Sequence, residues 1–234
     1  MNMTAHDDAI EQFNHGEQEA GIQAAVRDID AHPHDASRYS VLATMLITVR
    51  AYDQATTLIT RALGLFPDNP ELRYSWGLLA YTQQDLQDAL ARLLPLTSGP
   101  AAASGSLRAD ADYMVALCYN DLGQSARALA FAMTAHDLNP SARDAVVLMA
   151  NILLALGEFK AAVDALEPYL DQNDAHIDFA YGMALTASGR DGSAYLDAAK
   201  QADPAAFANQ SSQIHDIARF LKLGQTDTED SQDA

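Results

Sequence analysis

The sequence has little basic charge and almost no cysteine. It contains 14 lysine and arginine residues against 32 aspartate and glutamate residues, which gives a formal net charge of −18. Because this charge is repelled by phosphate backbones, we do not expect nucleic acid as a partner. The single cysteine, Cys118, cannot form an internal disulfide, and this composition suits a reducing compartment.

The sequence also lacks the apolar segments that target or anchor a protein. Residues 1–12 (MNMTAHDDAIEQ) do not follow the basic-then-apolar plan of a signal peptide. The longest apolar stretch, residues 145–156, is interrupted by Asn151 and is too short to span a bilayer. We therefore expect a cytoplasmic protein without membrane insertion.

No pattern typical of a catalytic, cofactor or metal site is present. The glycines stand singly, so they do not form a phosphate-binding loop. Cys118 lies in the middle of an expected helix, where packing is a better interpretation than nucleophilic chemistry. His32 and His34 flank Pro33, and this turn position already explains them without a metal. We expect a protein that is not an enzyme and has no cofactor.

Proline turns instead recur along the chain at a regular spacing. Pro33 and Pro67 are 34 residues apart, and Pro140 follows Pro67 at twice that period plus five residues. Valine and isoleucine are scarce beside alanine, which favours helix over sheet. Within residues 36–69, two apolar stripes with helical spacing are separated by a break at Ala51 and end at Pro67. The pattern predicts a helix–turn–helix unit of 34 residues.

The same plan predicts about six units. Their approximate ranges are 2–35, 36–69, 70–103, 109–142, 143–174 and 175–204. Small residues stand where the two helices of a unit should touch, namely at Ala43, Gly77, Ala116, Ala150 and Gly182. Alanines open the second helices, namely Ala55, Ala89, Ala128, Ala162 and Ala194. Only small side chains let two helices approach closely, and each helix pair must stack on the next to bury its apolar stripe.

This pattern resembles the tetratricopeptide repeat (TPR) family over residues 2–204. The resemblance implies an all-α fold, a right-handed α-solenoid of helix–turn–helix units. The sequence departs from the family at the aromatic residue usual early in the first helix. Tyr39 fills that place in the second unit, whereas Arg73, Asp112, Val146 and Asp178 stand there in the next four.

The segments outside the repeats have their own composition. The Gly-, Ser- and Ala-rich residues 97–108 are expected to form an extended loop that contains the five extra residues. Residues 205–223 carry an amphipathic stripe that predicts a capping helix, so that residues 1–223 would form one solenoid domain. The acidic residues 224–234 are expected to be a disordered tail.

The resemblance also implies a concave groove, lined by the first helices, that holds an extended or helical peptide. Side chains at positions i, i+4 and i+7 of a helix lie on one side of it, so these positions of each first helix line the groove. They begin with Ser40, Thr44 and Ile47 in the second unit. The predicted peptide-binding residues are Tyr74, Leu78, Tyr81, Tyr113, Leu117, Asn120, Val147, Asn151, Phe179 and Met183. Aromatic side chains offer contact area and asparagine can bond a peptide backbone, although the same aromatics could pack against neighbouring repeats.

The charge of this face indicates the kind of ligand. No lysine or arginine stands on it, so a clamp for a C-terminal carboxylate is not expected. Glu71, Asp110, Asp121 and Asp144 favour a ligand with apolar side chains and positive charge. We expect a non-enzymatic adaptor, scaffold or chaperone-like protein that binds a peptide segment of another protein. The alternative is a structural protein that forms homodimers through its solenoid ends or its groove.

Overall fold

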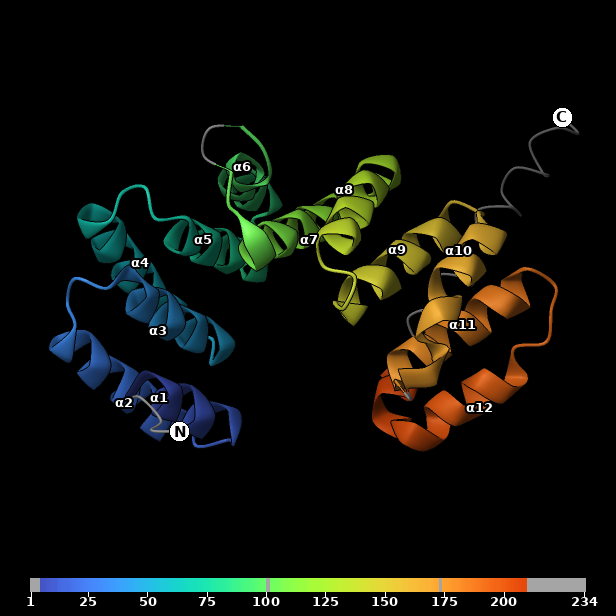
Figure 1. Ribbon diagram of the computed structural model, residues 1–234, viewed down its shortest axis with the longest axis horizontal. Coiled ribbons are helices and arrows are strands. Elements are labelled where there is room, and N and C mark those ends of the chain that lie inside the picture. Colours follow the sequence, from blue (N-terminus) through green and yellow to red (C-terminus); the bar gives the residue numbers. More distant parts are fainter. Residues whose placement is uncertain (1–4, 100–101, 173, 210–234) are drawn as a thin grey trace, which may run out of the picture. The chain divides into compact units, whose positions relative to one another are not determined.

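The computed structural model describes residues 5–99, 102–172 and 174–209. Every regular element in these residues is a helix, and no strand occurs among them (Figure 1). The predicted all-α fold of helix–turn–helix units is thus confirmed. The chain divides into two compact units, residues 1–142 and 143–234, which we call the N-terminal and the C-terminal unit. The predicted single domain over residues 1–223 stays a prediction.

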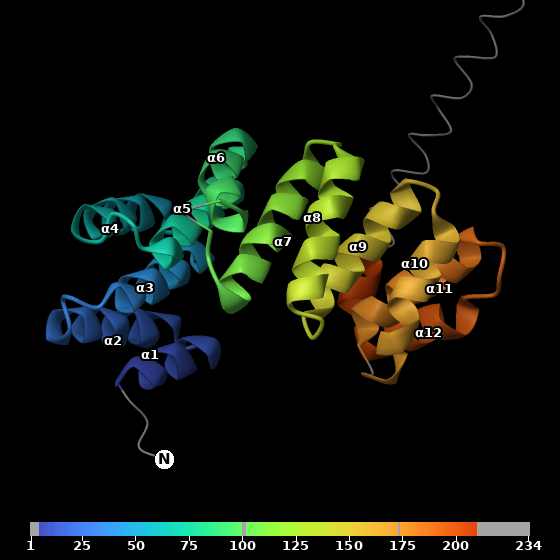
Figure 2. The same ribbon diagram turned by 45° about the horizontal axis from the view of Figure 1, so that its top comes forward.

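The N-terminal unit consists of four helical hairpins. Its helices are α1 (Ala5–Asn14), α2 (Gln18–Ala31), α3 (Ala36–Thr48), α4 (Tyr52–Leu65), α5 (Pro70–Thr82), α6 (Leu86–Thr97), α7 (Gly105–Asp121) and α8 (Ser125–Leu138). Each odd-numbered helix packs on the helix that follows it, and the hairpins stack in chain order (Figure 2). The first helices α1, α3, α5 and α7 also contact one another in sequence, so their side chains share one face of the unit.

The C-terminal unit repeats this plan in a shorter form. It contains α9 (Arg143–Ala155), α10 (Phe159–Leu166), the 3₁₀ helix η1 (Glu167–Gln172), α11 (Ala175–Ala187) and α12 (Ser193–Ala202). The regular α-helix ends early in α10, and η1 with Pro168 continues the chain toward α11. Because proline lacks a backbone donor, it cannot extend the α-helical hydrogen-bond pattern.

Short polar side chains begin several of the first helices. The Asp35 carboxylate accepts a hydrogen bond from Ser37 N at 3.1 Å, and Asn69 Oδ1 accepts one from Leu72 N at 2.9 Å. Asp174 does the same for His176 N at 2.9 Å. Each cap satisfies a donor that the first turn of a helix leaves unpaired. The caps explain why the units begin just after the turns that the sequence indicates.

The small residues lie where the helices of a hairpin cross. A Cβ atom added to Gly77 would stand 2.5 Å from Leu93 Cγ, and one added to Gly182 would stand 2.8 Å from Leu196 Cγ. Ala43, Ala116 and Ala150 are fully buried at the corresponding places. The close crossing is therefore confirmed at Gly77 and Gly182, where a larger side chain would push the helices apart, and the burial of the three alanines agrees with it.

A left-handed backbone residue ends the first helix of each hairpin. Glycine fills this place in four hairpins, with positive φ at Gly16, Gly123, Gly157 and Gly189. In the α3–α4 and α5–α6 turns the residue is instead Arg50 (φ 60°) or Gln84 (φ 63°). Side chains with a Cβ rarely adopt this conformation, so two of the turns are strained.

Two segments differ from the sequence prediction or lie partly outside the structure. The loop expected over residues 97–108 is wrong at both ends, because Thr97 is the last residue of α6 and residues 105–108 form the first turn of α7. Leu107 in this turn lines a cavity together with residues of the other first helices. Arg108 Nε lies 3.8 Å from Asp112 Oδ2 one turn later. Of the predicted capping helix, only residues 205–209 are described; they are helical together with Pro204. The predicted acidic tail lies outside the described residues.

Candidate functional site

A cavity of about 420 Å³ opens on the shared face of the first helices in the N-terminal unit. We call it the groove cavity. Its apolar wall consists of Ile10 and Phe13 from α1, Val41 and Met45 from α3, and Leu107 from α7. The remaining lining residues are Asn14, Ser40, Thr44, Thr48, Glu71, Tyr74 and Ser75. No lysine or arginine lines it, and Glu71 is its one charged side chain.

Three tyrosines continue this face from α5 to α7. Tyr81 donates a hydrogen bond through its hydroxyl to Asp121 Oδ2 at 2.9 Å, which joins the two helices. Burial, with smaller effects of the Asp110 charge and of Tyr113, raises the pKa of Tyr74 well above its ordinary value. The Tyr74 hydroxyl therefore stays neutral and available as a hydrogen-bond donor. We call Tyr74, Tyr81 and Tyr113 the tyrosine strip.

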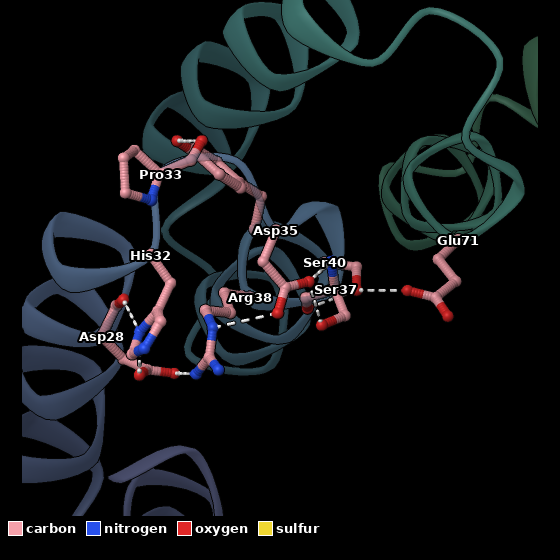
Figure 3. A network of polar contacts seen from close by, with 9 residues as sticks. Asp28, His32, Pro33, Asp35, Ser37, Arg38, Ser40 and Glu71 are labelled. Carbon is pink, nitrogen blue, oxygen red and sulfur yellow. Dashed lines mark hydrogen bonds and ion pairs between the residues drawn. The ribbon is translucent and has the colours of Figure 1, made fainter.

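A polar network extends from α2 to α5 (Figure 3), and two of its members, Ser40 and Glu71, line the groove cavity. Asp28 of α2 is only 3% exposed and forms an ion pair with Arg38 of α3. Arg38 Nε also donates to Asp35 at 3.1 Å. Further along α3, the Ser40 hydroxyl lies 3.3 Å from Glu71 Oε2 of α5. These contacts connect three helices and place the Ser40 hydroxyl beside the Glu71 carboxylate at the groove cavity.

The predicted site residues of the N-terminal unit lie on the expected helices and are accessible to different degrees. Tyr74 lines the groove cavity, together with Ser40 and Thr44. Leu78, Tyr81, Tyr113 and Leu117 are half-buried, and Asn120 is exposed. Ile47 belongs to the core instead of the groove, because it packs in one apolar cluster with Ala9 of the first unit.

The predicted site residues of the C-terminal unit are less open. Val147 and Met183 are half-buried and Asn151 is exposed. Phe179 is only 6% exposed, and its ring meets that of Phe207 edge-on at a centroid distance of 5.4 Å. The helical segment after α12 thus covers this aromatic side chain. Phe179 therefore packs within the chain, as in the alternative interpretation of the aromatic residues.

The structure adds groove residues that the sequence did not single out. Ile10 and Phe13 come from the weakest repeat, and their helical i, i+3 spacing was the available signal. Leu107 comes from the segment interpreted as a loop, which carries no apolar periodicity. Both contributions depend on contacts between successive hairpins.

The structure places Cys118 in the core and His32 beside a carboxylate. Cys118 is fully buried, and burial raises the pKa of its thiol to about 11, so the nucleophilic thiolate is disfavoured. His32 Nδ1 lies 3.3 Å from Asp28 Oδ1. Within the described ranges, no three candidate metal ligands gather at one place. Over the same residues, none of the helices has the length and apolar character needed to cross a bilayer.

Several solved structures share this fold at low sequence identity. The protein pilF of Pseudomonas aeruginosa is 16% identical with a TM-score of 0.71, over 90% of this chain and 96% of that one. TTC0263, a TPR protein of Thermus thermophilus, is 16% identical with a TM-score of 0.64, over 78% and 97%. YrrB, described as a TPR protein with an unusual peptide-binding site, is 19% identical with a TM-score of 0.58, over 82% and 99%.

Sequence comparison gives the family directly. No curated protein sequence matches the chain. The family model for the tetratricopeptide repeat matches residues 42–102 and 147–207, which together make up just over half of the chain. These residues include the helix crossings at Ala43, Gly77, Ala150 and Gly182 described above. The chain therefore belongs to the tetratricopeptide repeat family.

Proposed function

We propose that this TPR protein is an adaptor that holds a peptide segment of a partner protein on the face formed by α1, α3, α5 and α7. TPR proteins are protein–protein interaction modules, and YrrB is described as having a peptide-binding site. The observation that carries the proposal is the groove cavity beside the tyrosine strip. Its volume of about 420 Å³ admits apolar side chains of a peptide.

The electrostatics of this face support a ligand with basic as well as apolar side chains. Glu71 lines the cavity, and Asp110 and Asp121 stand beside the tyrosine strip. Tyrosine rings attract guanidinium and ammonium groups through their faces, and the carboxylates add to that attraction. The fold is one whose members are typically not enzymes, and we assign no catalytic step to this site.

Binding of defined peptides tests the proposal. The probes are labelled decapeptides of alternating leucine and arginine, leucine and glutamine, or leucine and glutamate, blocked at both ends. We expect the arginine peptide to bind most tightly in fluorescence polarisation. Tyr74→Ala combined with Tyr113→Ala should weaken it more than about tenfold, since loss of aromatic anchors at interfaces commonly costs about 2 kcal/mol or more.

Matched variants separate recognition from loss of structure. Glu71→Gln removes the charge at the cavity, whereas Glu11→Gln removes an exposed carboxylate of α1 that does not line the groove cavity. We expect only the former to weaken the arginine peptide. Equal affinities of the three peptides, or equal effects of the two variants, would refute the proposal. Sedimentation velocity of the unliganded protein distinguishes peptide binding from self-association.

A further inference from the structure

A second cavity lies on another face of the N-terminal unit and has the opposite charge. Its volume is about 330 Å³ and it is lined by Leu63, Pro67, Arg73, Trp76, Ala91, Arg92 and Pro95, from α4, α5, α6 and the turn after α4. We call it the arginine cavity. None of these residues lines the groove cavity, although α5 contributes side chains to both. Its charged residues are two arginines in a chain whose net charge is −18.

Arg92 is held so that one edge of its guanidinium group stays available. Its Nε forms an ion pair with Asp88 through a hydrogen bond to Oδ2 at 2.7 Å, and its Cζ lies 3.9 Å from the centroid of the Trp76 ring. Stacking and this hydrogen bond fix the plane of the group. Nη1 and Nη2 have no protein acceptor in the described part of the chain. A planar pair of donors in this position matches the two oxygens of a carboxylate.

Arg73 adds a second guanidinium group at the same cavity. Its Nε and Nη2 donate to the carbonyl oxygen of Pro67 at 3.3 Å and 2.9 Å, and Nη2 also reaches Asp68 Oδ1 at 2.7 Å. The Asp68 side chain is 94% exposed, so water screens its attraction and leaves much of the positive charge in effect. Nη1 has no acceptor among the described residues.

The remaining lining is apolar. Leu63, Trp76 and Pro95 offer a ring and aliphatic surfaces beside the guanidinium groups. A ligand that fills such a cavity needs a carboxylate and an apolar group close together. An acidic peptide segment with leucine-like side chains has both, and its backbone can cross an open surface.

We propose that the arginine cavity binds an acidic, apolar segment of a partner protein, with a carboxylate on Arg92 and Arg73 and an apolar side chain on Trp76. Charge complementarity selects this occupant, because the charged residues that line the cavity are the two arginines Arg73 and Arg92. The protein would then connect two partners of opposite charge through two faces that share α5. Binding at the arginine cavity does not depend on the proposed groove, whereas the connection of two partners rests on both sites.

Trp76 provides a direct measurement, because it is the single tryptophan of the chain and lines this cavity. The probe is an unlabelled octapeptide of alternating glutamate and leucine, blocked at both ends, and the comparison peptide has glutamine in place of glutamate. We expect the acidic peptide to change the Trp76 emission in a saturable and salt-sensitive way. A version with a free C-terminus separates side-chain carboxylates from a terminal carboxylate as the bound group.

Variants that each remove one charge test whether Arg92 binds the acidic peptide. Arg92→Gln should weaken the acidic peptide by about tenfold or more, because it removes charge-assisted hydrogen bonds. Arg61→Gln removes an exposed arginine of α4 that does not line the cavity, and it should leave the affinity within about twofold. Circular dichroism confirms that both variants stay helical. The Tyr74/Tyr113 variant should bind the acidic peptide normally, so the two proposals fail separately.

Three results would overturn the assignment. They are absence of any saturable change with the acidic peptide, equal binding of the glutamine peptide, and equal losses in Arg92→Gln and Arg61→Gln. If removal of residues 224–234 is needed before the peptide binds, the cavity belongs to the chain's own acidic end and not to a partner.

Discussion

Replacing Gln84 by glycine should stabilise the N-terminal unit. Gln84 has φ of 63° in the turn between α5 and α6, where four other hairpins have glycine. The left-handed conformation costs a residue with a Cβ about 1–2 kcal/mol. The Gln84 side chain contributes little to stability, since its one hydrogen bond, from Nε2 to Tyr81 O, is 3.5 Å long and exposed. A glycine at this place removes the steric cost.

The net gain is smaller than the strain, because glycine has more conformational freedom to lose when the chain folds. That loss amounts to about 0.5–1 kcal/mol. We therefore expect Gln84→Gly to raise the free energy of unfolding by about 0.5–1 kcal/mol. With a urea dependence of about 2 kcal/mol per molar, the midpoint should rise by about 0.3–0.5 M.

Urea unfolding followed by Trp76 fluorescence measures this change, because Trp76 lies in α5, the helix that ends at the turn. The matched control is the preceding residue, Gln83, which is exposed and has φ of −84°. Gln83→Gly should lower the midpoint, since it adds flexibility without relieving strain. If both variants shift the midpoint in the same direction, or if Gln84→Gly lowers it, the explanation by backbone strain is wrong.

Three further predictions concern buried groups. Burial raises the pKa of Asp112 from 3.8 to about 6, so the folded protein holds this proton more tightly than the unfolded chain. The stability that this protonated carboxyl contributes is fully present below pH 3.8 and is lost as the pH rises through about 6. Asp112→Asn should thus stabilise the protein by about 1–3 kcal/mol more at pH 8 than at pH 4 in urea titrations; equal effects would contradict this. Arg38→Ala should cost about 3 kcal/mol in the same assay because it leaves the Asp28 carboxylate buried without its arginine, and a loss below about 1 kcal/mol would exclude that role. Cys118 should resist a thiol reagent in the native protein and react fully in urea, whereas rapid native labelling would contradict its burial.

The sequence alone determines the helical hairpins, because their signals are local. Residues three and four apart share a helix face, so an apolar stripe and its interruption locate each helix and each turn. The small residues at the crossings follow from the same spacing, as Gly77 against Leu93 shows. The tyrosine strip could also be assigned to one side of α5 and α7, since Tyr74, Tyr81 and Tyr113 keep helical spacing within their units.

Only the tertiary structure decides which of these faces stay open. Ile47 has the spacing of a groove residue, yet it is buried in an apolar cluster that includes residues of the first repeat. Phe179 has the same spacing, yet Phe207 covers it from the segment after α12. The arginine cavity likewise needs Arg73 and Trp76 from α5 and Arg92 from α6 side by side. Helical spacing depends on neighbours along the chain, whereas exposure depends on contacts between separate helices and segments.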